Sequence, residues 1–262
     1  MISPLAHIAP GARIGSGVTI HPFAFIDDNT VIGDNCVIMP YASVMAGTTV
    51  GEGSTIYNGA IVGAAPQDFR WKPGQPSHCT IGARCVIREN VIINRGFATP
   101  EGTSIGDETF IMATAHIGHD CHLQGRTVVG NGVTMAGNIE IGACTILSSN
   151  SVVHEGSRIG EWVLIKGGCR ISGNVPPYVI IAHNPASYYG INASIMRKSD
   201  FTDERIDDIA KAYRHIYQSG TSVFNALQRI EADIDPSDER DKILSFIRDN
   251  KLRIVAVPID LE

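Results

Sequence analysis

A six-residue period of aliphatic residues runs through the first two thirds of this 262-residue chain and constrains its fold more than any other feature. Ten consecutive positions at this spacing, from Ile8 to Val62, are aliphatic, and the pattern returns over 81–93 and 105–171. Gly follows the aliphatic residue in ten of the 25 hexads, and a small residue stands four places after it in almost every hexad. Neither an amphipathic helix nor an alternating strand has this period.

A short strand followed by a tight turn, repeated every six residues, accounts for the pattern. The aliphatic and small residues then point inward, and Gly supplies either unusual backbone angles or room for close approach. Hexapeptide repeats of this kind are typical of a parallel β-helix. Five of the six cysteines share the small inward position, so packing explains them better than disulfides or metal binding.

The repeat is interrupted twice and then ends. We expect loops at 64–80 and 94–104, and loops that leave a regular solenoid often carry function. Two successive prolines in the VPPY segment (175–178) cannot continue a hydrogen-bonded coil, so we expect a β-helix over 1–178 and a C-terminal helical domain over 179–262.

Three helices are predicted in the second domain. The first covers 203–220 with Thr202 as N-cap, the second covers 222–234, and the third follows Asp235 as N-cap with Pro236 at its first position. The tail at 252–262 reads as extended and apolar, and its role does not follow from the sequence.

The formal charge of −6 has the wrong sign for a general nucleic-acid binder. No apolar run is long enough to cross a membrane and no signal peptide is recognisable, so we expect a cytoplasmic protein without stable membrane insertion. Residues 70–200 hold eleven basic against nine acidic side chains, which places anion-handling chemistry in the middle of the chain. Six of these cations are candidates for one basic flank that meets an acidic partner: Arg84, Arg88, Arg126, Arg158, Lys166 and Arg170.

The densest polar cluster is TAHIGHDCH, residues 114–122. His119 is the best candidate for a general base, because the adjacent Asp120 is able to orient it and stabilise its protonated form. An H-x-x-H-x-x-H zinc site is the alternative, but His116 and His122 share one hexad phase one face apart, so within one coil their side chains diverge. We therefore expect no metal site. For His116 and His122, exposed edge positions without a chemical role remain an open alternative.

The chain resembles the UDP-N-acetylglucosamine acyltransferases, the first enzymes of lipid A biosynthesis, over essentially its whole length. The AHIGHDC segment, the QDFRW loop at 67–71, IRENVIINRG at 87–96, VPPYVI at 175–180 and the 192–198 stretch carry the resemblance. It implies a left-handed parallel β-helix with about three hexads per coil, an exception to the right-handed crossover rule. It also implies a homotrimer with active sites between subunits.

The implied reaction transfers an R-3-hydroxyacyl chain from acyl carrier protein to the glucosamine 3-hydroxyl of UDP-N-acetylglucosamine. By the resemblance, His119 removes the hydroxyl proton, Asp120 orients His119, and the backbone N–H of Gly137 stabilises the oxyanion. No cofactor is expected, because the acyl chain arrives on the 4'-phosphopantetheine of the carrier protein.

The resemblance also implies the binding residues. Asp68 and His116 hold the sugar, with Gln67 and Arg70 beside them. His154 and Glu155 contact the donor and the nucleotide, whereas Asn192, Arg197 and Lys198 contact the uridine and the diphosphate. Leu164 and Gly167 set the acyl-chain length. Gly167 leaves room that a larger side chain would fill, which favours a long hydroxyacyl chain.

Three positions depart from the family pattern: Asn138 replaces a common His, Glu155 a usual Gln, and Ser194 a frequent acidic residue. Asn138 bears on the sugar contacts, so a 3-amino sugar acceptor that yields an amide stays open.

Three different functions also stay open for the chain. The first is a zinc protein resembling the trimeric gamma-class carbonic anhydrases, and the second is a non-catalytic solenoid. The third is a sister N-acyltransferase, which would be expected to carry an additional amino-terminal domain, whereas the hexads here start at Ile8.

Overall fold

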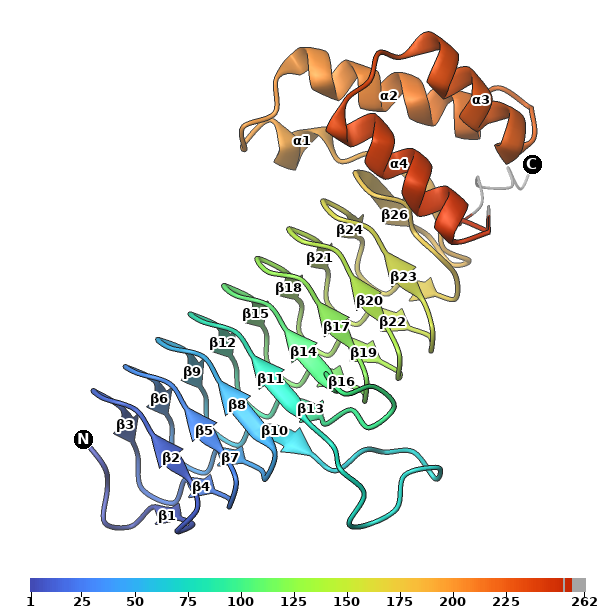
Figure 1. The fold of residues 1–262 in the computed structure, drawn as a ribbon. Coiled ribbons are helices and arrows are strands. Elements are labelled where there is room, and N and C mark those ends of the chain that lie inside the picture. Colours follow the sequence, from blue (N-terminus) through green and yellow to red (C-terminus); the bar gives the residue numbers. More distant parts are fainter. Residues whose placement is uncertain (252, 256–262) are drawn as a thin grey trace.

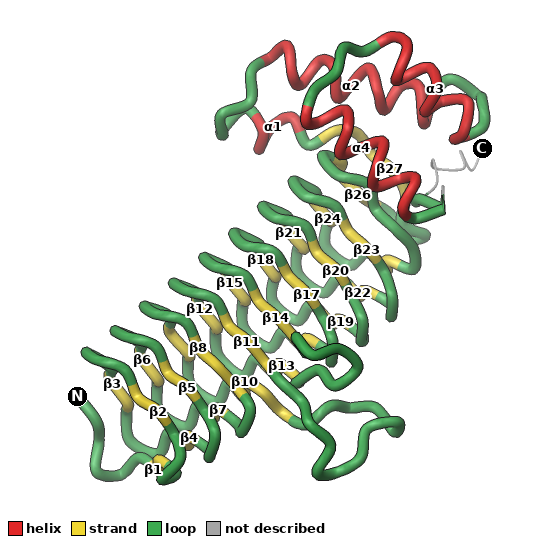
Figure 2. The backbone as a smooth tube through the Cα atoms, in the orientation of Figure 1, coloured by secondary structure: helices red, strands yellow, loops and turns green. Residues whose placement is uncertain are grey.

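The computed structural model describes residues 1–251 and 253–255, and its strands form three sheets wound around one axis (Figures 1 and 2). The first sheet contains β1 (His7–Ile8), β4 (Phe25–Ile26), β7 (Ser43–Val44), β10 (Ile61–Ala64), β13 (Ile92–Asn94), β16 (His116–Ile117), β19 (Thr134–Met135), β22 (Val152–Val153) and β25 (Arg170–Ile171). The second contains β2 (Arg13–Ile14), β5 (Val31–Ile32), β8 (Thr48–Val50), β11 (Cys79–Ile81), β14 (Thr103–Ile105), β17 (His122–Leu123), β20 (Glu140–Ile141) and β23 (Arg158–Ile159). The third contains β3 (Thr19–Ile20), β6 (Val37–Ile38), β9 (Thr55–Ile56), β12 (Val86–Ile87), β15 (Phe110–Ile111), β18 (Val128–Val129), β21 (Ile146–Leu147), β24 (Leu164–Ile165), β26 (Val179–Ala182) and β27 (Ser187–Ile191).

Each strand of the solenoid pairs in parallel with the third strand along the chain. Ile20 lies opposite Ile38 and Ile26 opposite Val44, so one coil takes 18 residues, or three hexads. The predicted left-handed parallel β-helix is confirmed.

The hexad aliphatics form the core, because each is the inward second residue of a short strand. Ile26, Ile38 and Ile56 are fully buried. A Cβ on Gly33, which follows Ile32, would lie 2.7 Å from the backbone N of Glu52 on the next coil. Close approach therefore explains this hexad glycine, and the left-handed backbone angles occur two residues later, at the turn.

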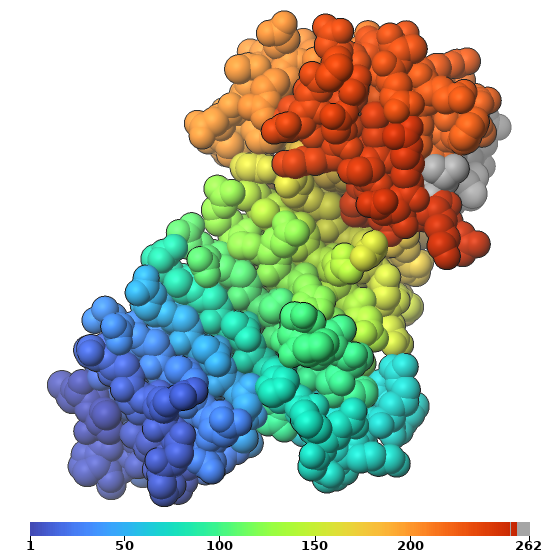
Figure 3. Space-filling model, viewed as in Figure 1, coloured from blue at the N-terminus to red at the C-terminus, as the bar shows by residue number. Residues whose placement is uncertain are grey.

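Two loops leave the solenoid at the corner between the first and second sheets. One connects β10 to β11 over 65–78 and the other connects β13 to β14 over 95–102, close to the predicted bounds. They are joined at their bases by two backbone hydrogen bonds of 2.9 Å between His78 and Gly96. Figure 3 shows the longer loop, in cyan, projecting from the solenoid surface.

In the described part of the chain, four helices cover the carboxyl-terminal end of the solenoid (Figure 1): α1 (Ala193–Met196), α2 (Asp203–Tyr217), α3 (Val223–Asp233) and α4 (Asp238–Asp249). Before them, β26 adds to β24 in parallel and β27 turns back antiparallel, so strands continue the third sheet beyond Tyr178. The division at 178/179 into two domains stays a prediction.

Local capping explains where the helices begin. The Thr202 side chain accepts a hydrogen bond from the backbone N–H of Arg205, as predicted for the N-cap of α2. The prediction of Asp235 as the cap of α4 was wrong: Ser237 accepts from the N–H of Arg240, and Pro236 precedes the helix. Among the described residues, none of the helices has the length and apolar character needed to cross a membrane.

The predicted tail lies partly outside the described residues, which exclude 252 and 256–262. Its described part contacts both the last coil and the helices. The N–H of Val255 donates to the carbonyl of Asn174 at 2.9 Å, and the hydroxyl of Tyr217 donates to the carbonyl of Val255 at 2.9 Å. This segment therefore connects α2 to the last coil.

Candidate active site

The corner between the first and second sheets carries candidate residues on three successive coils. The strands before it are in register, since β16 pairs with β19 and β19 with β22. The stacked corners present His119 and Asp120, then Gly137 and Asn138, then His154 and Glu155. Backbone hydrogen bonds hold the stack together: the N–H of Asn138 donates to the carbonyl of His119 at 3.0 Å.

The imidazole of His119 lies between two carboxylates. Its Nδ1 is 2.9 Å from Oδ2 of Asp120, and its Nε2 is 3.3 Å from Oδ2 of Asp68. All three side chains are less than a tenth exposed. A carboxylate on Nδ1 favours the tautomer with the proton there, so Nε2 carries the lone pair in the neutral imidazole. Nε2 donates to the Asp68 carboxylate only when the ring is protonated.

Asp120 is fixed by the backbone and by the shorter loop. It occupies the left-handed turn position with φ of 55°, which Asp tolerates better than most residues. Its second oxygen, Oδ1, accepts a hydrogen bond of 2.9 Å from the N–H of Ala98. The ring of Phe97 lies 5.4 Å from that of His119. The 95–102 loop therefore supports the His119–Asp120 pair.

Asp68 comes from the longer loop and is held by Arg70. Nε of Arg70 lies 3.0 Å and 2.9 Å from the two carboxylate oxygens, and the backbone N–H of Arg70 donates to Oδ1 at 2.7 Å. Hydrogen bonding by Arg70 lowers the pKa of Asp68 to about 2. Asp68 is therefore an ionised acceptor at neutral pH.

These groups line a cleft of about 800 Å³ between the longer loop and the first sheet. Its lining comprises Gln67, Asp68, Phe69, Arg70, His116, Gly118, His119, Thr134, Met135, Ala136, Gly137, Val152, Val153, His154, Glu155 and Arg170. A Cβ on Gly137 would lie 2.5 Å from Cε1 and Nε2 of His119, so only glycine lets the ring occupy this place. Within the described residues, the N–H of Gly137 has no backbone or side-chain acceptor.

His116 and His122 diverge, as predicted. His116 faces the cleft from β16, where burial lowers the pKa of its imidazole. His122 lies on β17 in the second sheet, with Nδ1 2.9 Å from Oγ of Ser104. No group of three His, Cys, Asp or Glu side chains in the described part of the chain is arranged to hold a metal ion.

Other predicted residues lie away from this cleft in the same chain: Leu164, Gly167, Asn192, Arg197 and Lys198. Leu164 begins β24 in the third sheet, and Gly167 lies in the exposed turn after it. The amide of Asn192 is buried and donates to the carbonyl of Trp162 at 2.8 Å. Nε of Arg197 donates to Asp203 at 3.2 Å. One chain alone does not bring this group to His119.

The six basic candidates do not all lie on one flank of the chain, and which of them would meet an acidic partner stays a prediction. Arg84 pairs with Glu108 at 3.0 Å beside the second sheet, Arg158 pairs with Glu140 at 2.6 Å on it, and Lys166 follows a strand of the third sheet. These cations lie on different faces because successive hexads turn through the three sheets of each coil.

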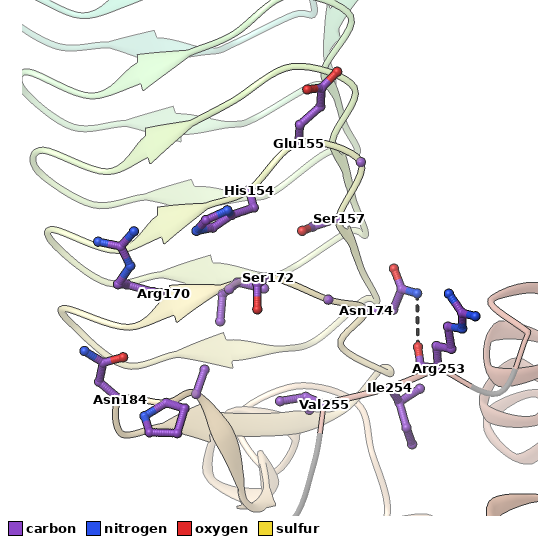
Figure 4. A pocket seen from close by; sticks show the side chains of 15 residues that line it. His154, Glu155, Ser157, Arg170, Ser172, Asn174, Asn184, Arg253, Ile254 and Val255 are labelled. Carbon is purple, nitrogen blue, oxygen red and sulfur yellow. Dashed lines mark hydrogen bonds between the residues drawn. The ribbon is translucent and has the colours of Figure 1, made fainter.

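Arg170 instead lines the cleft, and sequence reasoning did not place it there. It begins β25 and stacks in register on Val152, Thr134 and His116, so its shared hexad phase with His116 was the available signal. Arg170, His154 and Glu155 also border a second hollow of about 720 Å³ that extends toward Arg253 (Figure 4).

Comparison with known families agrees with the fold. Residues 174–255 match the family model described as UDP N-acetylglucosamine O-acyltransferase, domain 2, and residues 29–64 match the bacterial transferase hexapeptide model of six repeats. The acyl-(acyl-carrier-protein)–UDP-N-acetylglucosamine O-acyltransferase of Xylella fastidiosa is 36% identical over 190 residues, which are 72% of each protein.

Solved structures are similar over nearly the whole chain. A UDP-N-acetylglucosamine acyltransferase from Bacteroides fragilis superposes with a TM-score of 0.94 at 43% identity, covering 99% of this chain and 100% of that one. The enzyme of the same name from Campylobacter jejuni has a TM-score of 0.90 at 31% identity, with 99% of both chains covered. The hexad solenoid, the helical end and these relatives together show that the chain belongs to the UDP-N-acetylglucosamine O-acyltransferase family.

Proposed function

We propose that this protein transfers an R-3-hydroxyacyl chain from acyl carrier protein to the 3-hydroxyl of UDP-N-acetylglucosamine, the first step of lipid A biosynthesis. Membership of the family supports the reaction. The observation that carries the mechanism is His119, which is held by Asp120 through Nδ1 and directs Nε2 into a cleft lined by Gly137. This arrangement provides a base, an orienting carboxylate and a backbone donor in one place.

In the proposed reaction, Nε2 of His119 accepts the proton of the sugar hydroxyl as its oxygen attacks the thioester carbonyl carbon. A C–O bond forms and the carbonyl becomes an oxyanion, to which the N–H of Gly137 donates a hydrogen bond. The C–S bond then breaks, and the leaving thiolate takes the proton from Nε2. The products are the 3-O-acyl sugar nucleotide and the free carrier thiol, and no cofactor takes part in the proposed reaction.

Two carboxylates stabilise the imidazolium formed during the reaction. Asp120 and Asp68 contact opposite ring nitrogens of His119 at 2.9 Å and 3.3 Å. Because Arg70 keeps Asp68 ionised, Asp68 also suits acceptance of hydrogen bonds from sugar hydroxyls. We assign Gln67 and His116 to the same sugar.

We further propose that a second copy of the chain completes the site in a homotrimer. Asn192, Arg197 and Lys198 do not reach the cleft of their own chain, and Arg197 and Lys198 are exposed cations that suit a diphosphate. Leu164 and Gly167 would line the acyl chain from the same neighbour. We also propose a cytoplasmic location for the protein.

One contact at the cleft bears on a second possible acyl acceptor, a 3-amino sugar nucleotide. Nδ2 of Asn138 donates to Oε1 of Glu155 at 3.1 Å, so two of the three departures from the family pattern meet at the rim of the cleft. An added carboxylate there would suit a 3-amino sugar nucleotide, whose acylation by the same steps yields an amide.

The test offers purified protein both acceptors with a mixed pool of 3-hydroxyacyl carrier proteins and identifies products by mass spectrometry. We expect one acyl length on UDP-N-acetylglucosamine, released by mild alkali as an ester is. Acylation of the 3-amino analogue alone, in an alkali-stable linkage, would replace the proposed acceptor. Transfer to neither acceptor by trimeric protein would reject the proposed function.

A further inference from the structure

Arg70 joins the longer loop to the solenoid. Its guanidinium holds Asp68 within the loop, and its Nη2 lies 3.3 Å from Oε1 of Glu155, which is at the corner after β22. The same Oε1 accepts a hydrogen bond of 3.1 Å from Nδ2 of Asn138, one coil earlier. Arg70 therefore connects a carboxylate of the loop with a carboxylate of the solenoid corner.

Apolar packing holds the flanks of this segment, where Pro66 is buried and Trp71 is half-buried, but not the residues between them. Phe69 is 98% exposed, and residues 72–76 are exposed as well. The base of the loop is tied by the amide of Asn94, which donates to the carbonyl of Ala65 at 2.6 Å. Single exposed ion pairs contribute little to stability, but a forked guanidinium within a network of charges is the favourable case. The polar contacts are thus what hold Asp68 and Arg70 in place.

We propose that the contacts of Arg70, Glu155 and Asn138 form a latch that holds the 65–78 loop over the cleft and sets the position of Asp68 against Nε2 of His119. Glu155 and Asn138 act through Arg70 and Asp68, so they are positioning residues. The kinetic consequences rest on the proposed acyl transfer, whereas the position of the loop does not.

The latch also controls charge at the base. The titratable groups that face His119 are Asp120 from its own turn, Asp68 from the loop and His116 from β16, with Arg70 and Glu155 beyond Asp68. Opening the latch withdraws Asp68 from Nε2 and leaves the imidazolium with one carboxylate.

Hydrogen exchange of the unliganded protein tests the latch without any assay of activity. In Glu155→Ala, we expect the amides of 65–78 to exchange about tenfold faster, which corresponds to about 1.4 kcal/mol, with the solenoid core unchanged. Glu155→Gln keeps an acceptor for Asn138 and loses the charge, so its effect is smaller. Glu140→Gln removes an exposed ion pair with Arg158 on the second sheet and serves as the matched control. Unchanged loop exchange in Glu155→Ala would overturn the proposal.

Kinetics add a readout that a sugar contact alone would not move. We expect Glu155→Ala to lower kcat, and we expect Arg70→Lys and Glu155→Gln to combine non-additively. A rise in the acceptor KM alone, with kcat and loop exchange unchanged, would make Glu155 only a substrate contact and reject the latch. If the unaltered protein transfers no acyl chain, the proposed function fails and loop exchange still decides the latch.

Discussion

At the scale of single residues, the cleft is organised around an imidazole with a carboxylate on each nitrogen. Asp120 is less than a tenth exposed and also bonded to the N–H of Ala98, so it holds His119 in one orientation. Asp68 reaches Nε2 from a loop, which makes that contact adjustable. The rigid contact suits orientation of the base, and the adjustable one suits exchange for a substrate hydroxyl.

Gly137→Ala tests whether the place of the His119 ring matters. The new Cβ would lie 2.5 Å from Cε1 and Nε2, so the ring must shift. A misplacement of about 1 Å costs about 100-fold in rate, which is the loss that we expect. Initial rates of acyl transfer check this prediction. Gly173→Ala is the matched control, because a Cβ there meets no atom within 4 Å. Equal rates for both variants would remove the steric argument.

The pH dependence of activity separates the base from Asp68. Since Arg70 lowers the pKa of Asp68 to about 2, this carboxyl stays ionised as pH falls from 8 to 4, and the stabilisation that its ionisation gives the fold is lost only below that range. We expect the acid limb of kcat/KM to persist in Asp68→Asn. Profiles of both proteins measure this, and disappearance of the limb in the variant would assign it to Asp68.

At the scale of strands and turns, each hexad supplies one buried aliphatic and, three residues later, one turn position with positive φ. Asp120 (φ 55°) and Asn138 (φ 57°) both occupy that turn position. The hexad spacing predicts the coils well because strand, turn and burial repeat within six residues. The start of α4 was mispredicted because Asp235 and Ser237 are both able to cap a helix, and only the hydrogen bond to Arg240 decides between them.

Ile111→Ala tests the aliphatic ladder of the third sheet. Ile111 is fully buried between the strand partners Ile87 and Val129, so its truncation leaves a cavity that costs about 2–5 kcal/mol. Ile111→Val, at about 0.5–1.5 kcal/mol, is the matched control. Urea unfolding of the two variants measures the difference. A loss in Ile111→Ala no larger than that in Ile111→Val would mean that the ladder does not carry the stability of the coil.

At the scale of the whole molecule, the candidate residues divide into those the single chain brings together and those it does not. His119 and Asp120 are adjacent in sequence, and their pairing was predictable. The contact of Asp68 with His119 joins residues 51 positions apart through a loop without hexad pattern, so periodicity carries no information about it. The placement of Asn192 and Arg197 away from the cleft likewise follows only from how the helices sit on the last coil.

Mixed assemblies test whether a second copy completes the site. Co-expressed His119→Ala and Arg197→Ala/Lys198→Ala chains should regain activity that neither has alone, because a mixed assembly contains one cleft with all unaltered residues. Arg197→Ala mixed with Lys198→Ala should not recover, since both changes fall on the same contributing surface. Lack of recovery in assemblies shown to be mixed would place the whole site within one chain.

The most direct test of the account is acyl transfer to UDP-N-acetylglucosamine by the unaltered protein and by His119→Ala, followed by mass spectrometry. We predict a drop of about 100- to 10,000-fold in the variant, the range for loss of a positioned general base. His122→Ala, altered on the neighbouring sheet, should retain its rate. Transfer by His119→Ala at the unaltered rate would contradict the account, because the base would then lie elsewhere.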